Sequence, residues 1–187
     1  MNAMAVAQRM TAQEYLAEPF DEVRTQLVEG EVIVQEPNLL HQLVLRDLYD
    51  ALRAWQTAAT DRGDVSWAID VQIDERNVFG PDLLWYADGR PPLRHDERPY
   101  PVPDIAVEVR SPSTWRYDIG AKKSAYERNG LPELWLVDPT TVDVFVFRRS
   151  APKSASFDVA LELGRADTLS SPRLPGFALA LGALFPA

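Results

Sequence analysis

The sequence of 187 residues contains no cysteine and only two histidines, His41 and His95. The absence of cysteine excludes disulfide bonds, thiolate metal sites and cysteine nucleophiles. Two histidines are too few for a zinc site built from several imidazoles. The candidate metal ligands that are left are carboxylates. His95 lies in a loop rich in Pro and Arg, and we assign it no function.

Long hydrophobic runs are also missing, although 46% of the residues are hydrophobic. No run approaches the ~20 apolar residues of a membrane-spanning helix, so we expect no membrane association. Residues 1–10 lack the basic start, apolar middle and small-residue cleavage site of a signal peptide. These absences predict a cytoplasmic location. The length favours a single domain over residues 1–187.

Basic residues are scarce, with 19 Lys and Arg against 28 Asp and Glu and a net charge of −9. This balance argues against binding nucleic acid through a general positive field, but it does not exclude a local site. The densest basic stretch, residues 110–128, is either a solvated helix face or part of such a site. No helix-turn-helix, zinc finger or other base-reading element is present.

Periodicity predicts a mixed architecture. Helices are expected over 12–17, capped by Thr11, over 39–59, and over 118–129. In the second helix the apolar stripe consists of Leu40, Val44, Leu48, Leu52 and Trp55. Strands are expected in a hairpin over 26–34 and then over 65–73, 83–86, 105–109, 133–137, 142–148 and 157–163. The prediction is an α/β (α+β) fold with a mixed central sheet flanked by helices.

Two predicted strands carry the residues of greatest chemical interest. Asp82 precedes the strand 83–86, and Glu108 lies within the apolar strand Ile105-Ala-Val-Glu-Val109. Because neighbouring strands lie ~4.8 Å apart, two carboxylates at matching heights can share one Mg²⁺. Such an ion lowers the pKa of a bound water and neutralises phosphate charge. Asp82 can equally be a turn residue after Gly80-Pro81.

Glu108 needs a partner, because a buried lone carboxylate costs several kcal/mol. A metal, or a structural salt bridge to an arginine such as Arg110 or Arg128, would supply one. Asp104 shares a strand face with Glu108 but lies ~13 Å away, too far for the same ion. We expect Asp104 to begin the strand or to assist as an outer partner.

Lys122, Asp118 and Tyr126 fall on one face of the predicted helix 118–129. From there Lys122 can reach a metal-bound water or a phosphate, or it can form an ordinary helix ion pair with Asp118. Arg110 shares the strand face of Glu108 and can bind phosphate, but it is a poor base.

Two residues near the N-terminus complete the candidates. Glu31 in the hairpin is a candidate outer ligand. His41, near the start of the long helix, is a candidate phosphate contact, although a lone histidine there is more often a cap or a surface residue.

The chain carries these residues within recognisable segments. The segments are Gly80-Pro-Asp82, Pro103-Asp-Ile-Ala-Val-Glu-Val-Arg-Ser-Pro-Ser-Thr114, and Gly130-Leu-Pro-Glu-Leu-Trp-Leu-Val-Asp138, preceded by Leu27-Val-Glu-Gly-Glu-Val32. Together they resemble the Uma-type putative restriction endonuclease family of the PD-(D/E)XK nuclease superfamily. The resemblance covers roughly residues 10–150, which leaves a C-terminal strand and tail over 151–187.

The resemblance implies a restriction-endonuclease-like core and a Mg²⁺-dependent endodeoxyribonuclease, with Mn²⁺ as a substitute. DNA is the implied substrate, and a homodimer the implied assembly. Asp82 and Glu108 match the metal ligands and Lys122 the catalytic lysine, while Arg110 occupies the strand position of the superfamily lysine. One departure is Gln26, where family members usually have glutamate.

Two alternatives stay open. The chain can be a catalytically weak or inactive nuclease fold that binds nucleic acid or protein, which the acidic charge and Gln26 favour. It can also be a structural dimer closed by the apolar tail from Phe177 to Phe185, which the sequence leaves without an evident partner.

Overall fold

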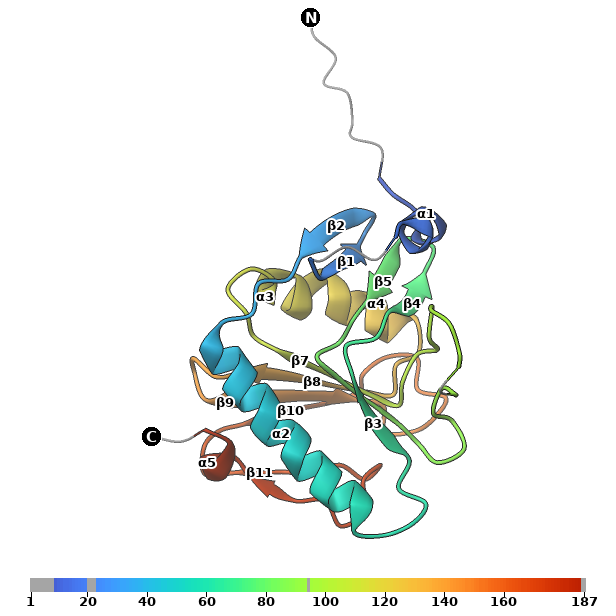
Figure 1. Cartoon of the computed structure of the whole chain (residues 1–187). Helices are drawn as coiled ribbons and strands as arrows, with labels where there is room; N and C mark the ends of the chain where they lie inside the picture. Colours follow the sequence, from blue (N-terminus) through green and yellow to red (C-terminus); the bar gives the residue numbers. More distant parts are fainter. Residues whose placement is uncertain (1–8, 20–22, 94, 186–187) are drawn as a thin grey trace, which may run out of the picture.

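The structure is a computed structural model that describes residues 9–19, 23–93 and 95–185 (Figure 1). Most of the N-terminal segment predicted to lack a signal peptide, residues 1–8, lies outside this range. Within the described ranges, no helix has the length and apolar character needed to cross a bilayer.

A six-stranded sheet forms the centre of the molecule (Figure 1). Its strands lie in the order β10-β9-β8-β7-β6-β3. Their bounds are β3 (Asp64–Trp67), β6 (Leu83–Tyr86), β7 (Ile105–Val109), β8 (Glu133–Asp138), β9 (Asp143–Arg148) and β10 (Val159–Leu163). The β7–β8 pair is parallel and the other pairs are antiparallel. The predicted mixed α/β architecture is therefore confirmed.

A second, four-stranded sheet was not predicted. Its order is β2-β1-β5-β4, from β1 (Thr25–Val28), β2 (Glu31–Val34), β4 (Val71–Asp74) and β5 (Asn77–Phe79). The alternation over 65–73 predicts one strand, but the chain bends at Ala68, which has a left-handed φ of 40°. As a result β3 joins the central sheet and β4 joins the second sheet.

The predicted N-terminal elements are confirmed. Helix α1 (Ala12–Ala17) begins with a capping box, in which Thr11 and Glu14 each bond the other's backbone N–H. The β1–β2 hairpin turns through Glu29 and Gly30, with φ of 51° and 80°. Positive φ at both central residues matches the twist of hairpin strands, and glycine takes it at little cost.

Helix α2 (Leu39–Thr57) crosses one face of the central sheet (Figure 1). Its inward stripe packs against β3 and β6–β9 in the larger core. The predicted stripe is wrong at its first position, because Leu40 is 48% exposed and His41 is buried instead. The other four predicted residues, from Val44 to Trp55, are buried. His41 is thereby directed towards the sheet rather than to solvent.

The opposite face of the central sheet is covered by a helical segment and by the second sheet. The segment consists of α3 (Trp115–Tyr117), the π-helical turn η1 (Asp118–Lys122) and α4 (Lys123–Arg128). The prediction of one regular helix over 118–129 thus misses an earlier start and a π turn. Because strand side chains alternate, Glu108 faces this segment, whereas Val107 and Val109 face the α2 core.

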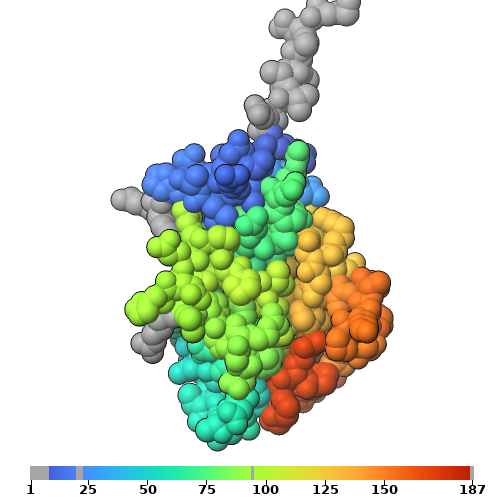
Figure 2. Space-filling view, turned by 90° about the vertical axis from the view of Figure 1, so that its right-hand side faces the viewer, coloured from blue at the N-terminus to red at the C-terminus, as the bar shows by residue number. Residues whose placement is uncertain are grey.

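The C-terminal segment is part of the core. It contains β11 (Thr168–Leu169), β12 (Leu179–Ala180) and α5 (Leu181–Leu184). In the space-filling view the red segment lies between α2 and the orange β9–β10 region (Figure 2). Phe177, Leu181 and Phe185 are each at most 5% exposed. The prediction that this tail is an exposed dimer surface is therefore wrong: its apolar side chains fill the core that α2 begins.

Candidate active site

The strand register brings Asp82 and Glu108 side by side. Leu83 on β6 pairs with Val107 on β7, so the next position in the register sets Asp82 beside Glu108. Both side chains are buried, at 5% and 2% exposed. The two strands therefore deliver two carboxylates to one point at the end of the β6–β7 pair.

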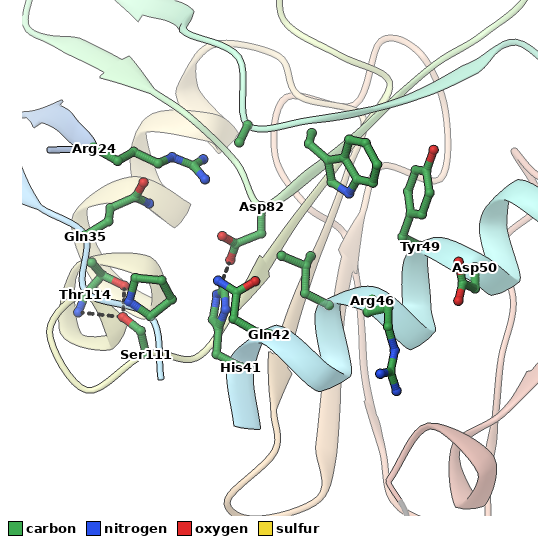
Figure 3. A pocket seen from close by; sticks show the side chains of 14 residues that line it. Arg24, Gln35, His41, Gln42, Arg46, Tyr49, Asp50, Asp82, Ser111 and Thr114 are labelled. Carbon is green, nitrogen blue, oxygen red and sulfur yellow. Dashed lines mark hydrogen bonds and ion pairs between the residues drawn. The ribbon is translucent and has the colours of Figure 1, made fainter. Parts of the chain in front are cut away.

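Asp82 is fixed by one backbone and one side-chain contact. Its Oδ2 accepts a hydrogen bond from the backbone N–H of Val109 at 2.8 Å. The same oxygen lies 3.1 Å from Nε2 of His41 (Figure 3). The inward turn of α2 at His41 thus orients the Asp82 carboxylate, and His41 is a positioning residue in this arrangement.

Glu108 has a cationic partner, which is not an arginine. Its Oε1 lies 2.6 Å from Nζ of Lys122 and accepts a hydrogen bond of 2.8 Å from the Tyr126 hydroxyl. Both partners come from the helical segment, and both are at most 1% exposed. The prediction that Lys122 and Tyr126 share a face directed at the sheet agrees with these contacts.

A third buried carboxylate completes the cluster. Oδ1 of Asp118 lies 2.9 Å from Nζ of Lys122, and Oδ2 accepts a hydrogen bond from the Thr114 hydroxyl at 3.0 Å. Asp118 and Lys122 are the first and last residues of the π turn, a feature often found at functional sites. The ion pair predicted from helix spacing exists, but it is buried rather than solvated.

Burial dominates the electrostatics of this cluster. It raises the pKa of Glu108 to about 7, with Lys122 opposing the shift and Asp118 and Asp82 adding to it. Burial likewise raises the pKa of Asp118. Burial alone would lower the pKa of Lys122, but Asp118 and Glu108 together outweigh it and raise that pKa. One ammonium group therefore balances two carboxylates, and the cluster carries excess negative charge when fully ionised.

The raised pKa of Glu108 predicts a pH-dependent stability. Between pH 4.5 and about 7 the folded chain binds a proton at Glu108 more tightly than the unfolded chain does. The free energy of unfolding must therefore fall as pH rises through this window. Glu108→Gln removes this titration. The free energy of unfolding of the variant, relative to that of the wild type, should therefore increase by on the order of 3 kcal/mol from pH 4.5 to pH 7. Denaturant titrations at pH 4.5, 5.5, 6.5 and 7.5 in EDTA measure this difference.

Glu162→Gln is the matched control, since Glu162 is exposed on β10. Its stability difference from the wild type should not vary across the same pH range. If the stability of Glu108→Gln relative to the wild type instead decreases as pH rises, then Lys122 rather than burial determines the pKa of Glu108.

A cavity of about 560 Å³ opens at Asp82. Helix α2 contributes one side of it, and β3, the residues that flank the β1–β2 hairpin and the 111–114 turn contribute the rest (Figure 3). The side chains discussed below belong to its lining: Arg24, Gln35, His41, Gln42, Tyr49, Trp67 and Asp82. Glu108 and Lys122 are not among the lining residues. The cavity thus gives a ligand access to one carboxylate, with the other directly beside it in the sheet.

The donor set suits a hard cation held by few protein ligands. Among the described residues, Oδ1 of Asp82 and Oε2 of Glu108 make no hydrogen bond or ion pair, so each carboxylate keeps one oxygen for a metal. Within the same residues, no three His, Asp or Glu side chains are grouped as a metal site. Mg²⁺ usually keeps several waters and takes one or two carboxylates plus substrate phosphate, so two carboxylates fit it.

Three predicted residues do not join this cluster. Glu31 is exposed in the hairpin and pairs with Arg9 at 3.6 Å. Asp104 lies at the other end of β7, where it accepts the Ala87 backbone N–H at 2.8 Å and pairs with Arg90. Arg110 pairs with Asp138 at 2.6 Å. Glu31 and Asp104 thus have partners away from the cluster, and the charge of Arg110 is already balanced.

Several residues that line the cavity were not among the predicted site residues. Tyr49 and Gln42 follow His41 on α2 at helical spacing, so recognising His41 as inward would have indicated them. Trp67 was expected to belong to a half-buried strand, but it is 53% exposed.

Comparisons with known proteins identify the family and the fold. The family Uma2, described as "Putative restriction endonuclease", matches residues 12–182. The match extends beyond the 10–150 segment expected from sequence and includes most of the C-terminal segment. A crystal structure of a putative nuclease belonging to DUF820 from Anabaena variabilis is similar to this chain, with a TM-score of 0.77. It is 18% identical, and the alignment covers 94% of this chain and 97% of that one. No curated protein matches the sequence.

Proposed function

The chain belongs to the Uma2 family of putative restriction endonucleases, and from this premise we propose that it is a divalent-metal-dependent endodeoxyribonuclease of the PD-(D/E)XK type. The observation that carries the proposal is that the register of β6 and β7 sets Asp82 beside Glu108, with Asp82 lining a cavity of about 560 Å³. Each carboxylate retains one oxygen for a cation. The fold shared with a putative nuclease supports the same class of activity.

Asp82 and Glu108 are the proposed ligands of Mg²⁺, for which Mn²⁺ can substitute. When bound, such an ion neutralises charge on the scissile phosphate and favours attack by water at phosphorus. His41 holds Asp82 in position through the 3.1 Å contact. Tyr126 and Lys122 hold Glu108, and the positive charge of Lys122 favours its ionised form.

Lys122 has a further role in this proposal. Its Nζ forms ion pairs with Glu108 at 2.6 Å and with Asp118 at 2.9 Å, but among the described residues it has no partner in hydrogen-bond geometry. An ammonium group has three N–H donors, so Lys122 can also donate to a phosphate oxygen or to the attacking water. Lys122 therefore combines a structural function with the catalytic one predicted from the sequence.

Gln26 occupies the position at which family members usually have glutamate. Gln26 is 2% exposed, and within the described residues its Oε1 has no hydrogen-bond partner. A neutral amide here removes one negative charge from the neighbourhood of the second sheet. We propose that the metal site operates with Asp82 and Glu108 alone.

Nicking of supercoiled plasmid tests the proposal. The chain should convert supercoiled to open-circular DNA with Mg²⁺ or Mn²⁺, and EDTA should abolish the conversion. Absence of nicking with either ion, at protein concentrations above that of the plasmid, would overturn it.

The second candidate is a nuclease fold that binds without cutting. The net charge of −9 and Gln26 favour it. Pairing of Asp82 and Glu108 with arginines, with no room left for a metal, would favour this candidate. Their partners are His41, Lys122 and Tyr126 instead, which favours the catalytic candidate.

A homodimer and a single-domain chain are further parts of the proposal. The tail that suggested a dimer surface is buried, so dimerisation now rests on the need to cut two strands. The joint packing of α2 and α5 in one core is the support for a single domain. Light scattering should give twice the mass of one chain, 42 kDa against the 21.0 kDa of the chain alone.

A further inference from the structure

Trp67 is an exposed aromatic residue that the fold does not explain. It is 53% exposed, whereas Val65, two positions earlier in β3, is 6% exposed. The ring of Trp67 stacks on Tyr49 of α2, with centroids 4.1 Å apart and planes inclined by 29°. Both residues line the cavity at Asp82. A stacked aromatic pair thus forms part of the wall of the proposed active site.

The backbone holds this pair near the proposed metal ligands. Trp67 pairs with Leu83, the residue directly after Asp82. Paired Cα atoms in antiparallel strands lie ~4.5–5.5 Å apart, so the Cα atoms of Trp67 and Asp82 are separated by roughly 9 Å at most. β3 ends at Trp67, and Ala68 then bonds back to the Pro81 carbonyl at 3.1 Å. The aromatic platform is therefore fixed on the strand next to Asp82.

Polar groups lie on the other side of the same cavity. Arg24 and Gln35 lie across from Tyr49, with Asp82 between them (Figure 3). Arg24 is anchored by a 2.7 Å bond to the Gly80 carbonyl and offers a cation for a phosphate. Oε1 of Gln35 is buried and has no hydrogen-bond partner among the described residues. Amide side chains of this kind match the donor and acceptor pattern of base edges.

The charge of the molecule decides what kind of nucleic acid fits. Non-specific duplex binding depends on many Lys and Arg contacts to phosphates, and this chain has a net charge of −9. Two of the five basic residues in its densest stretch are already engaged, since Lys122 is buried and Arg110 is paired with Asp138. Stacking of unpaired bases on aromatic rings adds affinity to that of the phosphate contacts, so a strand with unpaired bases depends less on basic surface than a duplex does. In a duplex the bases are already stacked on one another.

We propose that Trp67 and Tyr49 form a nucleobase-stacking subsite, and that the preferred substrate is DNA with an unpaired nucleotide beside the scissile phosphate. This inference rests on the proposed nuclease function and specifies its substrate. The base stacks on Trp67, Gln35 meets its polar edge, and Arg24 contacts the phosphate. The cavity volume of about 560 Å³ lies in the range of ordinary ligand sites.

Fluorescence anisotropy in EDTA tests the subsite without requiring cleavage. The probes are a labelled 12-nucleotide DNA strand, its blunt duplex and an RNA strand of the same sequence. The wild type should bind the DNA strand at least about tenfold more tightly than the duplex. Trp67→Ala should weaken single-strand binding about 5- to 150-fold, the range for loss of one stacked base. Trp67→Phe should retain most of the binding, because a ring remains.

Leu161→Ala is the control, since Leu161 is exposed on β10, away from the cavity-lining residues. It should bind as the wild type does. If Trp67→Ala does not fold, as judged by circular dichroism, quenching of tryptophan fluorescence by the DNA strand decides instead. Trp67→Phe should lose a large part of that quenching.

The outcomes separate this subsite from the proposed function. Equal binding of strand and duplex, an unchanged affinity in Trp67→Ala, or binding of the RNA strand alone would overturn the subsite. Cleavage of plasmid by the wild type would leave the nuclease function standing in each of those cases. Tight, Trp67-dependent strand binding by a chain that cuts nothing would support the subsite and reject the nuclease function.

Discussion

Asp82→Asn and Glu108→Gln are each expected to reduce Mg²⁺-dependent nicking of supercoiled plasmid by roughly 10²–10³-fold, as losses of one electrostatic contribution in an active site typically do. Each substitution keeps the shape of the side chain and removes one of the two negative charges that face a cation. The remaining carboxylate alone binds Mg²⁺ weakly, because the ion gives up its waters reluctantly. Rates from gel-resolved time courses at several Mg²⁺ concentrations measure the effect.

The control for this experiment is Glu162→Gln, an exposed substitution that removes the same charge from the net total. It should nick plasmid at the wild-type rate. Thermal unfolding of all three variants in EDTA separates loss of chemistry from loss of fold. Nicking that persists equally in Asp82→Asn, Glu108→Gln and the wild type would identify a contaminating nuclease and would favour the binding module.

Much of this site could be predicted from the sequence, because its residues lie on adjacent strands and on one helical segment. Asp82 and Glu108 lie at matching ends of two short apolar strands, and antiparallel pairing of those strands brings them together. The spacing of four between Asp118 and Lys122 likewise predicts their ion pair. The first inference needs the pairing of two strands that follow each other in the central sheet, and the second needs only the period of one helix.

The residues that could not be predicted depend on how elements are rotated against each other. At the start of α2, hydrophobicity favours burial of Leu40, yet the helix buries His41, whose ring meets Asp82. Alternation through Trp67 predicts a continuous strand, but the bend at Ala68 ends β3 there and leaves the indole in the cavity. In both cases a polar or aromatic side chain lies at the site although the hydrophobic periodicity of its own element predicts another position for it. Such local conflicts are expected at functional positions.

Asp104 and the C-terminal tail illustrate the opposite error. Asp104 has the residue type and strand face of a site carboxylate, but it lies at the other end of β7 and bonds Ala87 and Arg90. The tail has the composition of an interface, but it completes the core under α2. Residue type does not show which groups Asp104 contacts, and apolar content does not show what the tail packs against. Both depend on the topology of the fold.

Lys122→Met is expected to lower the free energy of unfolding by roughly 3–5 kcal/mol, the usual cost of removing one partner of a buried ion pair. Lys122 is 1% exposed and is the cation paired with both Glu108 and Asp118. Methionine fills much of the same space, so the loss reports the two uncompensated carboxylates rather than a cavity. The expected loss is large, because the free energy of unfolding of a typical domain is only about 5–15 kcal/mol. Denaturant unfolding at pH 7.5 in EDTA measures the change.

Asp118→Asn in the Lys122→Met background is the matched test of this explanation. Removing one of the two carboxylates should restore part of the lost stability, although Asp118→Asn alone should destabilise a chain that keeps Lys122. Opposite signs in the two backgrounds are the mark of a charge interaction, which loss of packing would not produce. If Asp118→Asn lowers stability equally in both backgrounds, Lys122 does not compensate Asp118. If instead the signs differ as expected, the double variant also isolates catalysis. A fold restored without Lys122 that still does not nick plasmid would show that Lys122 contributes to the reaction beyond its effect on stability.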